Sequence, residues 1–122
     1  ALGRGVTLGV DLERLRPRPR ALELADRFFA PGEAGRLQAL APERRELAFL
    51  RLWCAKEAVL KAHGQGLSFG LHRLEFIPDG DDEHAPLRLL ASVPELGAAS
   101  DWQLHEWIPA PGYLAALAWH PR

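Results

Sequence analysis

Two acidic residues stand two positions apart near the start of the chain, in the segment Val6-Thr7-Leu8-Gly9-Val10-Asp11-Leu12-Glu13. Asp11 and Glu13 would leave the same face of a strand, because successive side chains alternate between its two faces. Their carboxylates would then be close enough to share one cation, and hard oxygen ligands of this kind suit magnesium or manganese. The pair alone is more typical of an exposed strand face that carries two solvated acids.

A second group of charged residues follows Trp53, where Lys56, Glu57 and Lys61 lie within nine residues of helical sequence. Glu57 and Lys61 fall one turn apart on one helix face, with Lys56 beside them. They offer a third carboxylate for a metal and two ammonium groups for phosphate, which is the chemistry that a pyrophosphate clamp requires. The alternative is an ordinary surface ion pair.

The elements that must position these residues can be predicted from periodicity. Val6, Leu8, Val10 and Leu12 alternate with polar residues and glycine, which predicts a half-buried strand with its apolar side in the core. Helical spacing predicts helices over 21–29, 31–40 and, from about Pro42, 42–62, the last stopped by Gly64. Four further strands are expected over 74–77, 87–93, 102–108 and 113–119. The order favours an α+β fold with an antiparallel sheet packed against helices.

The composition sets limits on the class of protein. The chain has 122 residues, 48% of them hydrophobic and 25% charged, which suits one domain over 1–122. A formal net charge of −1 argues against a nucleic-acid partner. No apolar run approaches the roughly 20 residues that cross a bilayer, and no secretory signal is recognisable, so we expect no membrane partner and a cytoplasmic location. The single cysteine, Cys54, excludes an internal disulfide.

The two charged groups in this order carry more information than either does alone. Gly9-Val10-Asp11-Leu12-Glu13, followed by Trp53-Cys54-Ala55-Lys56-Glu57 and then Lys61, strongly resembles the signature of the 4'-phosphopantetheinyl transferase superfamily. The resemblance implies an enzyme that moves phosphopantetheine from coenzyme A to a serine of an acyl or peptidyl carrier protein. It also implies a magnesium ion, with manganese as an alternative, and a holo-acyl-carrier-protein synthase type of activity.

The same resemblance assigns roles to residues. The implied metal ligands are Asp11, Glu13 and Glu57, and Lys56 and Lys61 would contact the phosphates of the coenzyme. Glu57 could also act as the base that takes the serine proton, so Glu57 and Lys61 are the expected catalytic residues. His63 is placed near the coenzyme, although a histidine that caps the helix end is the alternative.

Lesser features are open to two interpretations. The arginines of the loop over 14–20 could receive an acidic carrier-protein helix or the 3'-phosphate of the coenzyme, or could simply be solvated. The glycines of Gly64-Gln65-Gly66 could allow close approach of the coenzyme, or could only form a turn.

Glu13 favours the larger, Sfp-like class, whose members resemble two tandem copies of this fold with the site between them. The chain resembles the C-terminal copy, so we expect either a missing N-terminal lobe or a homo-oligomer in which a neighbour supplies the other wall. Two rival hypotheses are a non-catalytic half-domain that binds carrier proteins and a structural subunit that pairs with a separate amino-terminal half.

Overall fold

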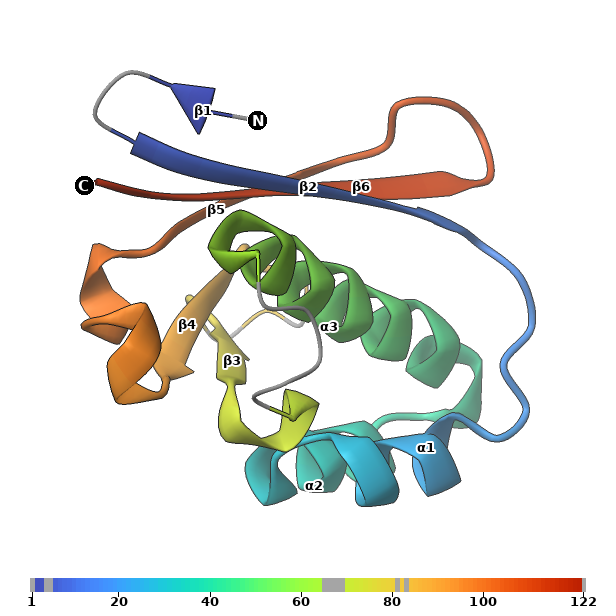
Figure 1. Ribbon diagram of the computed structural model, residues 1–122. Coiled ribbons are helices and arrows are strands. Elements are labelled where there is room, and N and C mark those ends of the chain that lie inside the picture. Colours follow the sequence, from blue (N-terminus) through green and yellow to red (C-terminus); the bar gives the residue numbers. More distant parts are fainter. Residues whose placement is uncertain (1, 4–5, 65–69, 81, 83, 122) are drawn as a thin grey trace.

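Residues 2–3, 6–64, 70–80, 82 and 84–121 are described by a computed structural model (Figure 1). The helices are α1 (Ala21–Phe28), α2 (Pro31–Ala39) and α3 (Pro42–His63), with short 3-10 turns η2 (Leu71–Arg73), η3 (Pro94–Leu96) and η4 (Ala99–Asp101). The strands are β1 (Leu2–Gly3), β2 (Val6–Arg14), β3 (Glu75–Pro78), β4 (Leu87–Ala91), β5 (Gln103–Trp107) and β6 (Tyr113–Pro121). Within these residues no helix is long and apolar enough to cross a membrane.

The strands form two antiparallel sheets. A four-stranded sheet has the order β1-β2-β6-β5, and β3 and β4 form a separate two-stranded sheet. In Figure 1 the four-stranded sheet covers one side of α3, while α1 and α2 lie on the opposite side of that helix. The α+β class and the antiparallel pairing are therefore confirmed. Alternation in the sequence does not separate the two sheets and does not predict β1, which is only two residues long.

The three helices begin and end within one residue of their predicted bounds. Gly64 follows α3 with φ of 87°, the left-handed conformation that a glycine adopts without steric cost, and its N–H is hydrogen-bonded to the Leu60 carbonyl. Pro31 and Pro42 each occupy the first turn of a helix, where the missing N–H leaves no hydrogen bond unmade.

The long helix α3 packs against β2 and β6 through small residues. Gly9 of β2 meets the backbone of α3 so closely that a Cβ at this position would lie 2.1 Å from the Ala58 carbonyl oxygen and 2.3 Å from the Ala62 nitrogen. Only glycine fits here, because the obstructing atoms belong to a helix backbone that cannot move aside cheaply. This contact brings β2 onto the helix at the start of the acidic segment.

The strand β2 faces the core with the side opposite to the one predicted. Gly9 and Asp11 are turned toward α3, and Asp11 is 3% exposed. Val10 and Leu12 lie on the outer face of the sheet and are 46% and 56% exposed. The expectation that the apolar side of this strand lies in the core is wrong, because close packing on α3 selects the side that carries glycine.

The Gly9 contact predicts a large effect of a small substitution. Gly9→Ala should lower the free energy of unfolding by about 1–3 kcal/mol, as expected for overpacking of a well-packed interior. Urea denaturation would measure the change, with Gly35→Ala in α2 as the control, because a Cβ at Gly35 meets nothing within 4 Å. Equal stability of the two variants would contradict this description of the β2–α3 contact.

Candidate active site

Four charged residues come together where β2 passes α3. Asp11 and Glu13 project from the inner side of β2, and Glu57 and Lys61 project from consecutive turns of α3. Lys61 Nζ donates a hydrogen bond of 2.6 Å to Asp11 Oδ1. We call Asp11, Glu13, Glu57 and Lys61 the carboxylate site. The interpretation of Asp11 as a solvated surface acid is excluded by its burial.

Asp11 has one satisfied and one unsatisfied oxygen. Its Oδ1 accepts the bond from Lys61, whose side chain is 52% exposed. Its Oδ2 is buried and has no hydrogen-bond donor among the described residues when the neighbouring carboxyls are ionised. An unmatched buried carboxylate oxygen is costly. A proton on a neighbouring acid, or a cation, would relieve that cost.

The two other carboxyls are shifted toward their protonated forms. Burial raises the pKa of Glu13 to about 7, and the hydrogen bond with Asp11 and the charges of Asp11 and Glu57 act in the same direction, against Arg18. The pKa of Glu57 is raised by burial and by Asp11, with Lys61 opposing. The pKa of Lys61 is raised, first by its hydrogen bond to Asp11. The site therefore has more negative charge than one ammonium group neutralises.

The donor set of this site suits a hard divalent cation. As the side chains stand, no group of three or more His, Cys, Asp or Glu residues in the described part of the chain is arranged to hold a metal ion. The unmatched Asp11 Oδ2 and the raised pKa values of Glu13 and Glu57 nevertheless indicate carboxylates that a cation would stabilise in their ionised forms. All three are oxygen donors, which magnesium and manganese prefer.

Lys56 is not brought to the carboxylate site, contrary to the expectation that it contacts phosphate. Its side chain is 0% exposed, and Nζ lies 2.7 Å from Glu33 Oε1 and 2.7 Å from the Leu71 carbonyl oxygen. A third hydrogen bond goes to the carbonyl of Leu74. These three acceptors use all the donors of an ammonium group. Lys56 is a structural residue in this arrangement.

Glu33 is the buried partner that the sequence analysis did not assign. Its Oε1 also accepts the N–H of Ala30 at 3.0 Å, and its Oε2 accepts the N–H of Phe76 at 2.8 Å. Glu33 and Lys56 therefore join the start of α2, the middle of α3 and the start of β3. The signal in the sequence was the position of Glu33 in the first turn after Pro31, where an acidic side chain reaches back to cap the helix.

His63 is the last residue of α3, two positions beyond Lys61, and is partly exposed. The loop over 65–69, including Gly66, lies outside the described residues, so the expectation that it approaches the coenzyme stays a prediction. The contact of His63 with the coenzyme also stays a prediction.

A small cavity adjoins the carboxylate site. Its volume is about 260 Å³, and its lining combines the charged residues Glu13, Arg16 and Arg18 with apolar residues. The apolar residues are Leu24, Phe28, Phe49, Leu50 and Trp53. Two arginines of the loop over 14–20 thus line a hollow beside the acids.

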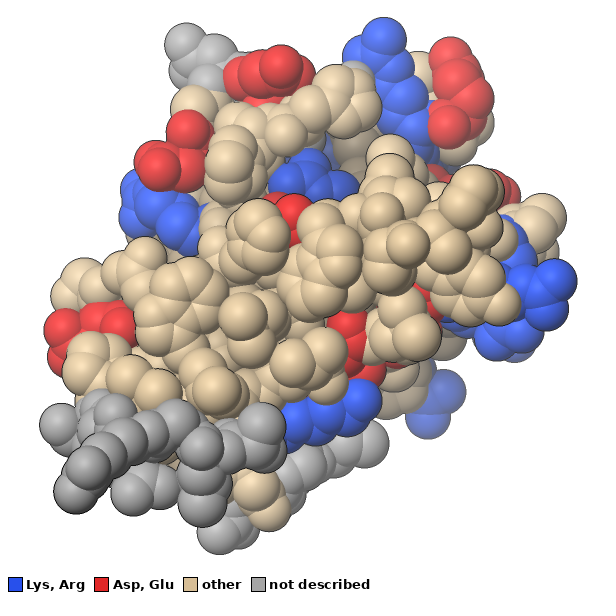
Figure 2. Space-filling model, turned by 90° about the horizontal axis from the view of Figure 1, so that it is seen from above, with Lys and Arg blue, Asp and Glu red and all other residues tan. Residues whose placement is uncertain are grey.

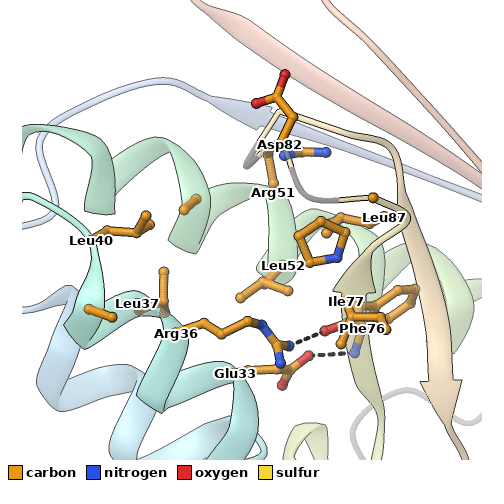
Figure 3. Close-up of a pocket in the computed structure, with 14 residues that line it drawn as sticks. Glu33, Arg36, Leu37, Leu40, Arg51, Leu52, Phe76, Ile77, Asp82 and Leu87 are labelled. Carbon is orange, nitrogen blue, oxygen red and sulfur yellow. Dashed lines mark hydrogen bonds between the residues drawn. The ribbon is translucent and has the colours of Figure 1, made fainter.

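A second cavity of about 530 Å³ lies elsewhere, between α2, α3 and the β3–β4 pair (Figure 3). Its lining is mainly apolar, and Glu33 and Arg36 each form a hydrogen bond to the backbone of Phe76 at its wall. No member of the carboxylate site lines this cavity.

The buried pair predicts unequal effects for the two lysines of α3. Lys56→Met would leave Glu33 buried without its cation and should lower the free energy of unfolding by about 3–5 kcal/mol. Lys61→Met removes a half-exposed partner but leaves the buried Asp11 carboxylate without its hydrogen bond, so it should cost less, about 1–3 kcal/mol. Urea denaturation would compare the free energies of unfolding of the two variants. A Lys56→Met variant as stable as Lys61→Met would contradict the structural role.

The raised pKa of Glu13 predicts a pH-dependent stability in metal-free buffer. The folded chain holds the Glu13 proton up to a pH of about 7, whereas an unfolded glutamate loses it near 4.5, so this residue makes the fold less stable as the pH rises between those values. Glu13→Gln should therefore gain stability relative to the wild type between pH 5 and pH 8, by about 1 kcal/mol after allowance for solvent screening. Thermal unfolding of both proteins in a chelating buffer would measure this gain. If Glu13→Gln and the wild type differed in stability by the same amount at pH 5 and at pH 8, the raised pKa of Glu13 would be refuted.

Known proteins resemble this chain over most of its length. The family model of the 4'-phosphopantetheinyl transferase superfamily matches residues 7–118. The putative 4'-phosphopantetheinyl transferase slr0495 of Synechocystis is 43% identical over 97 residues, which are 80% of this chain and 37% of that protein. The 4'-phosphopantetheinyl transferase HetI of Nostoc is 36% identical over 121 residues, covering 94% of this chain and 46% of its own length. The chain thus spans about half the length of these relatives, or less.

A solved structure gives the same fold. The ACPS–CoA complex of Chronobacterium ammoniagenes matches with a TM-score of 0.64 and 21% identity, covering 96% of this chain and 98% of that one. At that identity the likeness is evidence for the fold only. With the family match over residues 7–118 and relatives of 36–43% identity, the chain belongs to the 4'-phosphopantetheinyl transferase superfamily.

Proposed function

We propose that this chain supplies the metal-binding half of a magnesium-dependent 4'-phosphopantetheinyl transferase, which acts on coenzyme A and a carrier-protein serine. The observation that carries the proposal is the carboxylate site, where acids from β2 and α3 meet beside a half-exposed lysine. The named activity of the relatives supports the reaction class. The cytoplasmic location expected from the sequence belongs to the same proposal.

Asp11, Glu13 and Glu57 would hold the magnesium ion, with manganese as a substitute. A divalent cation bound there supplies positive charge that stabilises non-bridging phosphate oxygens during phosphoryl transfer. The unpartnered Asp11 Oδ2 and the high pKa of Glu13 both support these ligands, because each marks negative charge that Lys61 and Arg18 do not fully neutralise.

Lys61 would contact the pyrophosphate of the coenzyme. Its side chain is 52% exposed and is tied only to Asp11 in the described contacts, so it can turn toward a bound anion once another cation neutralises Asp11. His63 lies two residues further along α3 and is kept as a candidate contact for the coenzyme. Lys56 is left out, because its ammonium group is buried and fully bonded.

In the proposed reaction the serine oxygen forms a bond to the phosphorus that carries the pantetheine arm. The bond from that phosphorus to the bridging oxygen breaks, and adenosine 3',5'-bisphosphate leaves. Glu57 would accept the serine proton, a role that its raised pKa favours, or would act only as a ligand. Arg16 and Arg18, which line the cavity beside Glu13, would attract an acidic carrier protein toward the site.

A second candidate function is binding to a carrier protein without catalysis. It is favoured by one observation: the relatives are more than twice as long as the part that matches this chain. If the rest of such a protein supplies essential coenzyme contacts, this chain alone would keep the fold and lack the activity. The same observation supports a structural subunit that pairs with a separate half.

Glu57→Gln separates these functions by experiment. With coenzyme A, magnesium and an apo-carrier protein, the wild-type chain should add one phosphopantetheine to the carrier, detected by mass spectrometry. The Glu57→Gln variant should do so at least about a hundredfold more slowly, because a metal ligand and phosphate electrostatics are lost. The control is Glu46→Gln on an exposed turn of the same helix, which should behave as the wild type. Equal rates for Glu57→Gln and Glu46→Gln would overturn the site assignment, whereas no transfer by any form would favour the non-catalytic module.

A further inference from the structure

The cavity between α2, α3 and the β3–β4 pair has the size and lining of a small-molecule site. Its volume is about 530 Å³, within the roughly 300–1,000 Å³ of pockets that hold small ligands. Apolar residues of both helices and both strands surround it (Figure 3); among them are Leu37, Leu40, Ala48, Leu52, Ile77 and Leu87. We call it the apolar cavity. The proposed function makes no use of it.

Four charged residues also line the apolar cavity, and three of them offer a ligand no unmatched charge. Glu33 is paired with the buried Lys56. Arg51 donates hydrogen bonds of 2.8 Å to both carboxylate oxygens of Glu106, and the two side chains are largely buried. Asp82 is exposed, and its carboxylate points away from the cavity in Figure 3.

The fourth charged residue, Arg36, has a positive charge that is only partly matched. Within the described part of the chain its guanidinium donates one hydrogen bond, to the Phe76 carbonyl, and its ion pair with Glu75 is 3.9 Å long, beyond hydrogen-bond distance. The Glu75 carboxylate lies over Gly32 in the first turn of α2, where the helix terminus attracts it as well. A guanidinium has five N–H donors, so Arg36 retains donors for a second carboxylate.

We infer that the apolar cavity binds an amphipathic monocarboxylate, with an alkyl chain of medium length among the leucines and the carboxylate on Arg36. The planar fork of a guanidinium matches a carboxylate. A single cation in an apolar lining does not suit a pyrophosphate, and a cationic ligand would meet Arg36 as a like charge. The inference goes beyond the proposed function and does not depend on it.

A second apolar surface provides an internal comparison. Figure 2 looks down on the four-stranded sheet and shows a broad tan surface with most of the charged side chains gathered around it. Val10 and Leu12 are half exposed on this side of the sheet. An alkyl chain that only seeks apolar contact would bind there as well, so the test must locate the ligand.

NMR titration of sodium octanoate into the isotope-labelled protein tests this inference. Octanoate should bind saturably at one site with a Kd of about 1 mM or below, and the largest amide shifts should occur at Leu37, Leu52 and Ile77. Octylammonium has the same chain and the opposite charge, and it should bind at least about tenfold more weakly because it meets a guanidinium instead of pairing with it.

Two variants change the apolar cavity in different ways. Arg36→Gln should weaken octanoate binding at least about tenfold through loss of a charged hydrogen-bond donor. Its matched control is Arg88→Gln on β4, because Arg88 is also about half exposed and paired with a carboxylate, that of Asp79, but does not line the cavity. Ala48→Phe should weaken octanoate to a similar extent by filling the cavity from α3, and it replaces Arg36→Gln if the amide spectrum shows that variant to be unfolded.

The inference is supported if the octanoate shifts lie around the apolar cavity and binding is weakened in Arg36→Gln but not in Arg88→Gln. It is overturned if no saturable binding occurs, if the shifts centre on Val10 and Leu12, if octylammonium binds as tightly as octanoate, or if Arg36→Gln binds like the wild type. Glu57→Gln should bind octanoate normally, so a failure of the proposed chemistry and a failure of this site would be told apart.

Discussion

The close contact between Gly9 and the backbone of α3 decides where the acids of this protein lie. A strand that approaches a helix to this distance must turn its smallest residue toward it, and the residue two positions on then follows into the same interface. Asp11 is buried for this reason, although burial of a carboxylate is unfavourable in itself. The hydrogen bond from Lys61 offsets this cost at Asp11 Oδ1. Asp11 Oδ2 has no partner, and a bound cation would provide one.

The helix α3 presents its two lysines to different environments. Lys56 points into the core, where Glu33 and two carbonyl groups hold it beneath the ring of Phe29 at 5.1 Å. Lys61 lies at the edge of the sheet and keeps half of its surface in water. The first lysine fixes α2 and β3 to the helix, and the second presents an ammonium group, bonded to Asp11, at the solvent-exposed edge of the site. A buried, fully bonded residue behind an exposed one is the kind of support that a binding group requires.

Much of the fold could be predicted from the sequence because its helices and strands have clear periods. Local chemistry such as Pro31, Pro42 and Gly64 fixed the helix ends to within one residue. The face of β2 that enters the core could not be predicted from alternation alone, since that pattern assumes that apolar residues are inside. Gly9, opposite the small residues Ala58 and Ala62 of α3, was the signal for the reverse arrangement.

The candidate site was predicted in part. The strand period pairs Asp11 with Glu13 and the helix period pairs Glu57 with Lys61, but only the resemblance to the family joined the two pairs, which the structure does bring together. Lys56 was misplaced because adjacency to Glu57 in the sequence puts it on another helix face, the face of Leu52 and Leu60, both of which are buried. Only the long-range partner Glu33 makes that burial possible, and no local pattern in the sequence identifies such a pairing.

Calorimetric titration of coenzyme A into the purified chain, with and without magnesium, would show whether the buried acids bind a cation that receives the pyrophosphate. Binding should require magnesium and should disappear in Asp11→Asn, because the cation and Lys61 together receive the pyrophosphate. Binding of equal strength in the absence of magnesium, or in Asp11→Asn, would contradict the claim that these buried acids form a cation site.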